Sequence, residues 1–140
     1  MRLPRLILVL LAAFLLAGCA SGGGSRTDAL DRAQYAWSGA IRWGDFEGAL
    51  NLVDPDTRAG LTPAALGFER YKQVQISSYR DLGEDRDTEG GTAVREIEIG
   101  VINRHTQAER VVRYRERWRW DEASRTWWNT SGLPDLWAGQ

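Results

Sequence analysis

Arginines and aromatic residues crowd the last third of this chain, and their spacing is the first sign of binding chemistry. Side chains alternate across a strand, so arginines at every second position lie on one face and could bind a carboxylate, a phosphate or lipid headgroups. Four do so: Arg113, Arg115, Arg117 and Arg119. The alternative is a solvent-exposed face neutralised by acids, for which the candidates are Glu96, Glu98, Glu109 and Glu116. The net charge of −1 favours this alternative; an edge or homodimer-forming role for the face stays open.

Five of the seven tryptophans lie between Trp118 and Trp137. A short chain needs large side chains to fill its core, and three of the seven are expected there: Trp37, Trp118 and Trp128. Trp127 is adjacent to Trp128 on one predicted strand and must point the other way. We therefore expect Trp127 and Trp137 to form an aromatic ligand wall or a partner surface. Three tyrosines could line the mouth of a cavity: Tyr35, Tyr71 and Tyr79.

Catalytic patterns are missing from the sequence. His105, the only histidine, falls in a predicted turn, and Asp45 is best placed to cap a helix. No Ser–His–Asp set, metal-ligand cluster or phosphate-cradling glycine loop is present. The sequence predicts no catalytic residue, no metal site and no cofactor, and favours a protein that is not an enzyme.

The N-terminus has the parts of an export signal. Arg2 and Arg5 precede an apolar run of 11 residues, 6–16, which is short of the roughly 20 that span a bilayer. The run closes on Leu16-Ala17-Gly18-Cys19 and so resembles a bacterial lipoprotein signal peptide ending in a lipobox. This resemblance implies cleavage before Cys19, the only cysteine, and attachment of lipid to it. By the same resemblance Ala20, in place of Asp, implies the periplasmic face of the outer membrane of a Gram-negative cell.

The chain then divides into three parts. Residues 1–18 form the predicted signal peptide, 19–26 the lipidated cysteine with a Gly/Ser tether, and 27–137 one domain. Without a basic excess, binding to nucleic acid is not expected.

Helical periodicity dominates the first half of the domain. Thr27 or Asp28 is expected to cap a helix that Gly44 ends, with an apolar stripe at Leu30, Ala33, Trp37, Ala40 and Ile41. Asp45 is expected to cap a second helix that ends at Asp54-Pro55, and Thr62-Pro63 to open a third.

The second half alternates with a period of two. Strands are expected over 74–77, 92–102, 107–120 and 126–130, with an acidic loop at 83–91 and a turn at 103–106. This turn would pair Ile102 with Gln107, and therefore Glu96 with Arg113.

Helices followed by a four-stranded antiparallel meander make an α+β fold. The segments 43–50 and 117–128 resemble those of the NTF2-like (cystatin-like) cone, in which a curved sheet wraps a long N-terminal helix, and the end resembles small NTF2-like lipoproteins. We therefore expect an envelope lipoprotein that acts through protein interaction. Two alternatives stay open: a small-ligand binder that uses the cone cavity, and a cryptic isomerase- or hydratase-like enzyme, which requires an inward-facing acid or tyrosine with a perturbed pKa.

Overall fold

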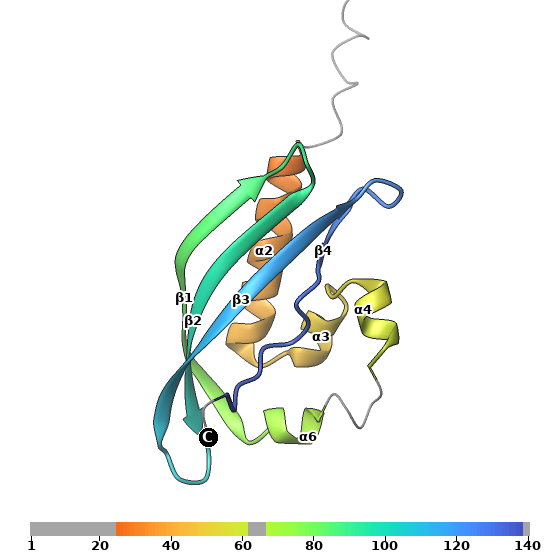
Figure 1. Cartoon of the computed structure of the whole chain (residues 1–140). Coiled ribbons are helices and arrows are strands. Elements are labelled where there is room, and N and C mark those ends of the chain that lie inside the picture. Colours follow the sequence, from red (N-terminus) through yellow and green to blue (C-terminus); the bar gives the residue numbers. More distant parts are fainter. Residues whose placement is uncertain (1–24, 62–66, 139–140) are drawn as a thin grey trace, which may run out of the picture.

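The computed structural model describes residues 25–61 and 67–138 (Figure 1). A long helix lies against a curved antiparallel sheet, and short helices flank one end of it. This arrangement confirms the predicted α+β fold. The lipobox and most of its tether fall in 1–24, outside the described residues; the tether prediction is wrong at its last two positions, where Ser25 caps a helix that starts at Arg26. Within the described part of the chain, no helix is long and apolar enough to cross a membrane.

Helix α2 (Arg26–Trp43) is the central helix. It starts slightly earlier than predicted because Ser25 and Asp28 form a reciprocal capping box. Its end is as predicted: Gly44 adopts a left-handed conformation with φ 73°. The helix buries Leu30, Gln34, Trp37 and Ile41 against the sheet.

Two short helices follow. Asp45 caps α3 (Phe46–Leu50) by accepting from the Gly48 amide at 2.8 Å, which confirms the predicted cap. The prediction that Asp54-Pro55 only ends a helix is incomplete, because Pro55 is the first residue of α4 (Pro55–Ala59), a position that proline favours. The predicted start at Thr62-Pro63 lies outside the described residues, and α6 (Phe68–Tyr71) leads into the sheet.

The sheet has the order β1-β2-β3-β4, with strands β1 (Val74–Asp87), β2 (Thr92–Asn103), β3 (Glu109–Asp121) and β4 (Thr126–Asn129). The expected acidic loop at 83–91 is wrong over its first half, since β1 continues to Asp87. Two register irregularities, near Ser77 and Leu82, keep β1 paired with β2. Arg86 pairs with Glu84 of this acidic stretch at 2.7 Å and with Asp31 of α2 at 2.6 Å.

The register of β2 with β3 differs from the prediction by two residues. Ile102 pairs with Glu109, and Glu96 pairs with Arg115. The connection is longer than a four-residue turn because the Asn103 side chain accepts from two loop amides and Gln107 adopts a positive φ of 58°. A shift of two leaves every side chain on its predicted face.

Strand β4 has the opposite orientation to the one predicted. Trp127 is 1% exposed and Trp128 is half-buried, so the expectation that Trp128 is core and Trp127 a ligand wall or partner surface is wrong. Asn129 explains the inversion: its backbone bonds to the Leu52–Asp54 segment in a parallel bridge, and its buried side chain shares the inner face with Trp127.

Candidate functional site

A buried polar cluster lies between α2 and the sheet, centred on Glu116 of β3. Glu116 is fully buried, and its carboxylate accepts from the Arg95 guanidinium at 2.7 and 2.9 Å. The same oxygen, Oε2, accepts from the Trp118 indole at 3.0 Å, and the other oxygen accepts from the Tyr79 hydroxyl. We call these four residues the Glu116 cluster.

Two opposing effects set the charge of Glu116. Burial raises the pKa of its carboxyl to about 8. The indoles of Trp118 and Trp37 lower this pKa. The Arg95 guanidinium, which donates to the carboxylate at 2.7 Å, also favours the charged form. The Trp37 N–H completes no hydrogen bond of normal geometry, although it lies close enough to affect Glu116. Burial also lowers the pKa of Arg95, which has Asp81 at 3.7 Å as a second acidic neighbour.

Glu116 corrects the sequence analysis, which placed it among the acids of the outer face. Tyr114, Glu116 and Trp118 alternate along β3 and all three are buried, so Glu116 lies on the inner face. The sequence contained a signal for this: Trp118 was expected in the core, and a residue two positions earlier on the same strand lies on the same face. Arg95 lies on the same face of β2 as Ile97, and both residues are buried.

The inside of the curved sheet is occupied by side chains. The Trp37 ring stacks on Tyr114 at 6.3 Å and meets Trp118 edge-on at 6.0 Å, measured between ring centroids. Tyr79 also lines an open hollow of about 470 Å³ between β1 and the end of α2, with Arg42 and Trp43. A substrate would therefore have to displace packed side chains to reach Glu116.

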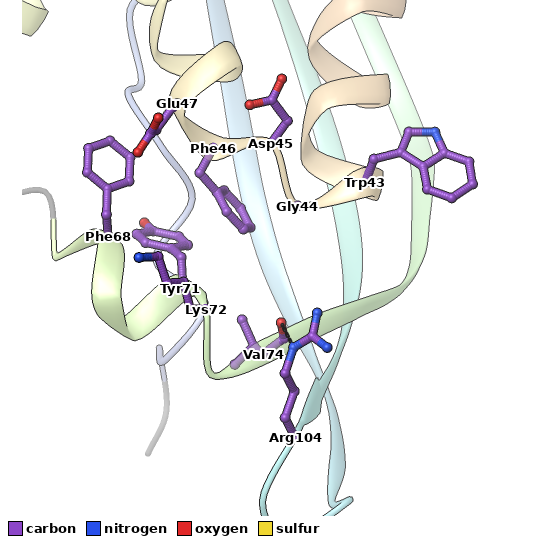
Figure 2. A pocket seen from close by; sticks show the side chains of 10 residues that line it. All are labelled: Trp43, Gly44, Asp45, Phe46, Glu47, Phe68, Tyr71, Lys72, Val74 and Arg104. Carbon is purple, nitrogen blue, oxygen red and sulfur yellow. Dashed lines mark hydrogen bonds between the residues drawn. The ribbon is translucent and has the colours of Figure 1, made fainter.

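An open groove lies elsewhere, at the C-terminal end of α2 (Figure 2). Its volume is about 320 Å³. Figure 2 shows Phe46 and Tyr71 beside each other at its centre, with the Trp43 indole projecting from the end of α2. We call it the Trp43 groove; it is lined by Trp43, Gly44, Asp45, Phe46, Glu47, Phe68, Tyr71, Lys72, Val74 and Arg104.

Aromatic contacts support the floor of this groove. The rings of Phe46 and Tyr71 are 4.3 Å apart, and Tyr71 meets Trp137 edge-on at 5.0 Å. The Tyr71 hydroxyl donates to the Pro134 carbonyl at 2.8 Å, and burial together with Asp135 raises its pKa to about 12. Of the residues that the sequence singled out for contacts, Tyr71 thus lines the groove, and Trp137 packs against Tyr71 without lining it.

Both signs of charge line the groove. Lys72, the only lysine, pairs with Glu69 at 2.6 Å, a contact that raises its pKa. Arg104 donates through Nε to the Val74 carbonyl at 3.0 Å and leaves its terminal nitrogens without a carboxylate partner among the described residues. Asp45 is engaged in capping α3. The groove thus has an aromatic floor, with two cations and two acids, Asp45 and Glu47, among its lining residues.

The arginine row lies on the outer face of β3, as the sequence predicted. Arg113 pairs with Glu98 at 3.4 Å, Arg115 pairs with Glu96, and Arg119 pairs with Asp54 at 2.6 Å. Beside them, a hollow of about 340 Å³ places Arg115 and Arg117 among three acids: Glu84, Asp85 and Glu96. Acids surround most of this row, which supports a neutralised outer face over an anion site.

The remaining candidates are dispersed. Tyr35 is 80% exposed on α2, whereas Tyr79 is 6% exposed inside the sheet, so the three tyrosines do not share one cavity mouth. The ring centroids of Trp127 and Trp120 are 5.7 Å apart. The Trp127 indole N–H donates to the Arg26 carbonyl at 2.9 Å. Residues 25–61 and 67–138 contain no group of three or more His, Cys, Asp or Glu side chains that could hold a metal ion.

Comparison with solved structures gives similarity in fold at low sequence identity. A SEC-C motif containing protein from Rhodopseudomonas palustris is 17% identical over 69% of this chain and 70% of its own, with a TM-score of 0.54. Another from Psychrobacter arcticus is 11% identical over 78% of this chain and 62% of its own, with a TM-score of 0.57. A ketosteroid isomerase-like protein from Erwinia carotovora atroseptica is 16% identical over 74% of this chain and 89% of its own, with a TM-score of 0.51.

These likenesses define the class of the domain by its architecture. Helices packed on an open four-stranded antiparallel sheet are consistent with the NTF2-like fold that the sequence predicted. No protein-family model matches the sequence, and no curated protein matches it either. The similarity to solved structures therefore supports the fold alone, and any proposal about activity has to come from the side chains.

Proposed function

We propose that this chain is a lipid-anchored protein of the bacterial cell envelope that binds a protein partner through the Trp43 groove. The observation that carries the proposal is the contrast between a filled interior and an open groove. Trp37, Trp118 and Trp127 are each at most 2% exposed inside the sheet, whereas Trp43 is 89% exposed beside the groove. Large aromatic side chains with an adjacent arginine are enriched where proteins bind one another.

The anchor part of the proposal depends on the lipobox at Cys19. Replacing Cys19 with Ser removes the thiol that carries the lipid, so the chain should leave the membrane fraction and lose incorporation of labelled fatty acid. Wild-type cells treated with globomycin, which blocks signal cleavage of lipoproteins, should accumulate the uncleaved chain. Unchanged fractionation of the Cys19→Ser variant, without lipid label on the wild type, would contradict the anchor.

Because Lys72 is the only lysine, an amine-reactive crosslinker tests for a partner at one known position. Lys72 lines the groove and its side chain is 69% exposed, so an amine-reactive crosslinker can join this chain to a partner through Lys72. Acylation would block the one other amine, at the mature N-terminus. Crosslinking in intact envelopes should yield a discrete adduct that the Lys72→Arg variant lacks.

A matched control moves the amine to the outer face of the sheet. Arg117 is exposed there and has no ion pair among the described residues, so a Lys72→Arg, Arg117→Lys chain keeps the composition unchanged. The adduct should stay absent in this chain. An adduct of the same size from both positions would indicate random collision and would count against the groove.

The Glu116 cluster favours a second candidate function, an isomerase- or hydratase-like enzyme. An inward-facing carboxyl with a raised pKa and a bonded Tyr79 hydroxyl is the feature such chemistry requires, and one structural neighbour is ketosteroid isomerase-like. Trp118 donates to Glu116 and can report on binding by its fluorescence. Titration with a panel of enolisable ketones should leave the fluorescence unchanged if the protein is an interaction module. A saturable change that Glu116→Gln abolishes would instead favour the enzyme.

A further inference from the structure

Helix α2 presents two exposed aromatic rings, and the second of them, Trp43 in the last turn, also borders a hollow beside β1. Tyr35 is 80% exposed and Trp43 is 89% exposed. The two residues are eight positions apart, which is about 2.2 turns and roughly 12 Å along the axis, so their side chains project about 80° apart around the helix. Gly39 lies midway, with open space around its Cβ position. We call this surface the α2 outer face; it comprises Arg32, Tyr35, Ala36, Gly39 and Trp43.

The charged residues on and beside this face favour binding to a negatively charged surface. Asp28 is engaged in the capping box, and Asp31 pairs with Arg86 at 2.6 Å. Arg32 is exposed and has no acidic partner among the described residues. The face thus combines a tryptophan, a tyrosine and a free arginine, the residue types that favour the headgroup level of a bilayer.

The length of chain before α2 places this face within reach of a membrane. Ser25, the N-cap, follows Cys19 by six residues, a span of at most about 21 Å. Helix α2 has 18 residues and is about 27 Å long. Lipid on Cys19 would therefore keep the whole helix close enough to the bilayer to lie along it.

We infer that the α2 outer face docks on the phospholipid surface to which Cys19 is anchored, with the rings of Tyr35 and Trp43 at headgroup depth. This inference rests on the lipid attachment proposed above. Docking would present the outer face of the sheet to the periplasm. It would also hold the mouth of the Trp43 groove beside the bilayer, because Trp43 borders both surfaces.

Gly39 is the position at which to test the orientation. Lipidation consumes the only native thiol, so a Gly39→Cys chain can be labelled with a fluorophore at that site alone, between the two rings and without removing either. Val111→Cys is the matched control, since Val111 is 58% exposed on the outer face of the sheet. The lipidated full chain is reconstituted in vesicles of phosphatidylethanolamine and phosphatidylglycerol that carry a headgroup nitroxide quencher.

The label at position 39 should be quenched several-fold more than the label at 111. Adding Tyr35→Ser and Trp43→Ser to the Gly39→Cys chain should reduce the quenching to the level of the control while the chain still floats with the vesicles. Equal quenching at 39 and 111 in a vesicle-bound, acylated chain would overturn the docking and leave the anchor standing. A chain without acyl mass on Cys19 would overturn both. Shielding of position 39 in native envelopes but not in protein-free vesicles would show that a protein covers the face, and would also overturn the inference.

Discussion

The Arg95 guanidinium and the Glu116 carboxylate form two hydrogen bonds, at 2.7 and 2.9 Å, inside the curved sheet. Glu116 is fully buried and Arg95 is 8% exposed. At a pH where the Glu116 carboxyl is charged, this is an ion pair removed from water, and it is costly to break because the remaining charge has no solvent to stabilise it. The effect of removing either partner should therefore depend on pH.

Removal of Arg95 should have a cost that depends on pH. In Arg95→Met the Glu116 carboxylate loses its cationic partner, so its pKa should rise further. Above pH 8.5, where the wild-type carboxyl is charged, we expect a loss of about 3 to 5 kcal/mol in the free energy of unfolding. At pH 5, where the carboxyl is protonated in both chains, the loss should be smaller. Urea denaturation of the domain at the two pH values measures the difference; a cost independent of pH would contradict it.

The raised pKa of Glu116 predicts a pH dependence of stability with a definite sign. The folded-state pKa is about 8, whereas an unfolded glutamate titrates near 4.3. Between these values the folded chain holds a proton that the unfolded chain has released, so stability falls as pH rises from about 5 to 8, by up to about 1.4 kcal/mol per pH unit. In Glu116→Gln this contribution should vanish. If the variant and the wild type have parallel profiles over that range, the carboxyl titrates normally.

Two buried tryptophans should respond differently to the same substitution. Trp118 donates to Glu116 at 3.0 Å, whereas the Trp37 indole completes no hydrogen bond. Replacement by Phe removes a similar ring area in both, but only Trp118→Phe leaves Glu116 with one donor fewer. We expect Trp118→Phe to be more destabilising than Trp37→Phe by about 1 to 2 kcal/mol. Thermal unfolding of both variants at one pH makes the comparison, and an equal or larger loss in Trp37→Phe would contradict it.

Two glycines of the α2 region should give opposite results on replacement by alanine. Gly44 holds φ at 73°, where a Cβ is strained, so Gly44→Ala should cost about 1 to 2 kcal/mol. Gly39 is helical with open space around its Cβ, so Gly39→Ala should stabilise the protein by about 0.5 to 1 kcal/mol. The midpoints of chemical denaturation test both signs. A destabilising Gly39→Ala would indicate a contact on the α2 outer face.

Local patterns in the sequence predicted most of the elements. Gly44 and Asp45 mark the end of α2 and the cap of α3 in both the prediction and the structure, because caps depend on neighbouring backbone groups alone. The faces of β2 and β3 were also predictable, since alternation survives a register shift of two. The register itself depended on how Asn103 organises its loop, which a residue count does not reveal.

Part of the candidate site could be predicted and part could not. Tyr71 and Trp137 were predicted as contact residues; Tyr71 lines the Trp43 groove, and Trp137 packs edge-on against Tyr71. Trp127 was placed on the wrong face because its direction depends on Asn129 and its bridge to Val53, 76 residues earlier in the chain. Trp43 was not predicted as a contact residue. A tryptophan is usually buried, and the exposure of Trp43 depends on its position at the end of α2.

The sequence by itself determined the class of the fold, the caps and the alternation of the strands, since each depends on residues that are close along the chain. It also carries the lipobox pattern at Cys19. Only the tertiary structure decided that Glu116 lies inside with Arg95 and that α2 leaves Tyr35 and Trp43 exposed. Burial and pairing across the sheet are long-range properties, because they depend on which distant segments come together around a side chain.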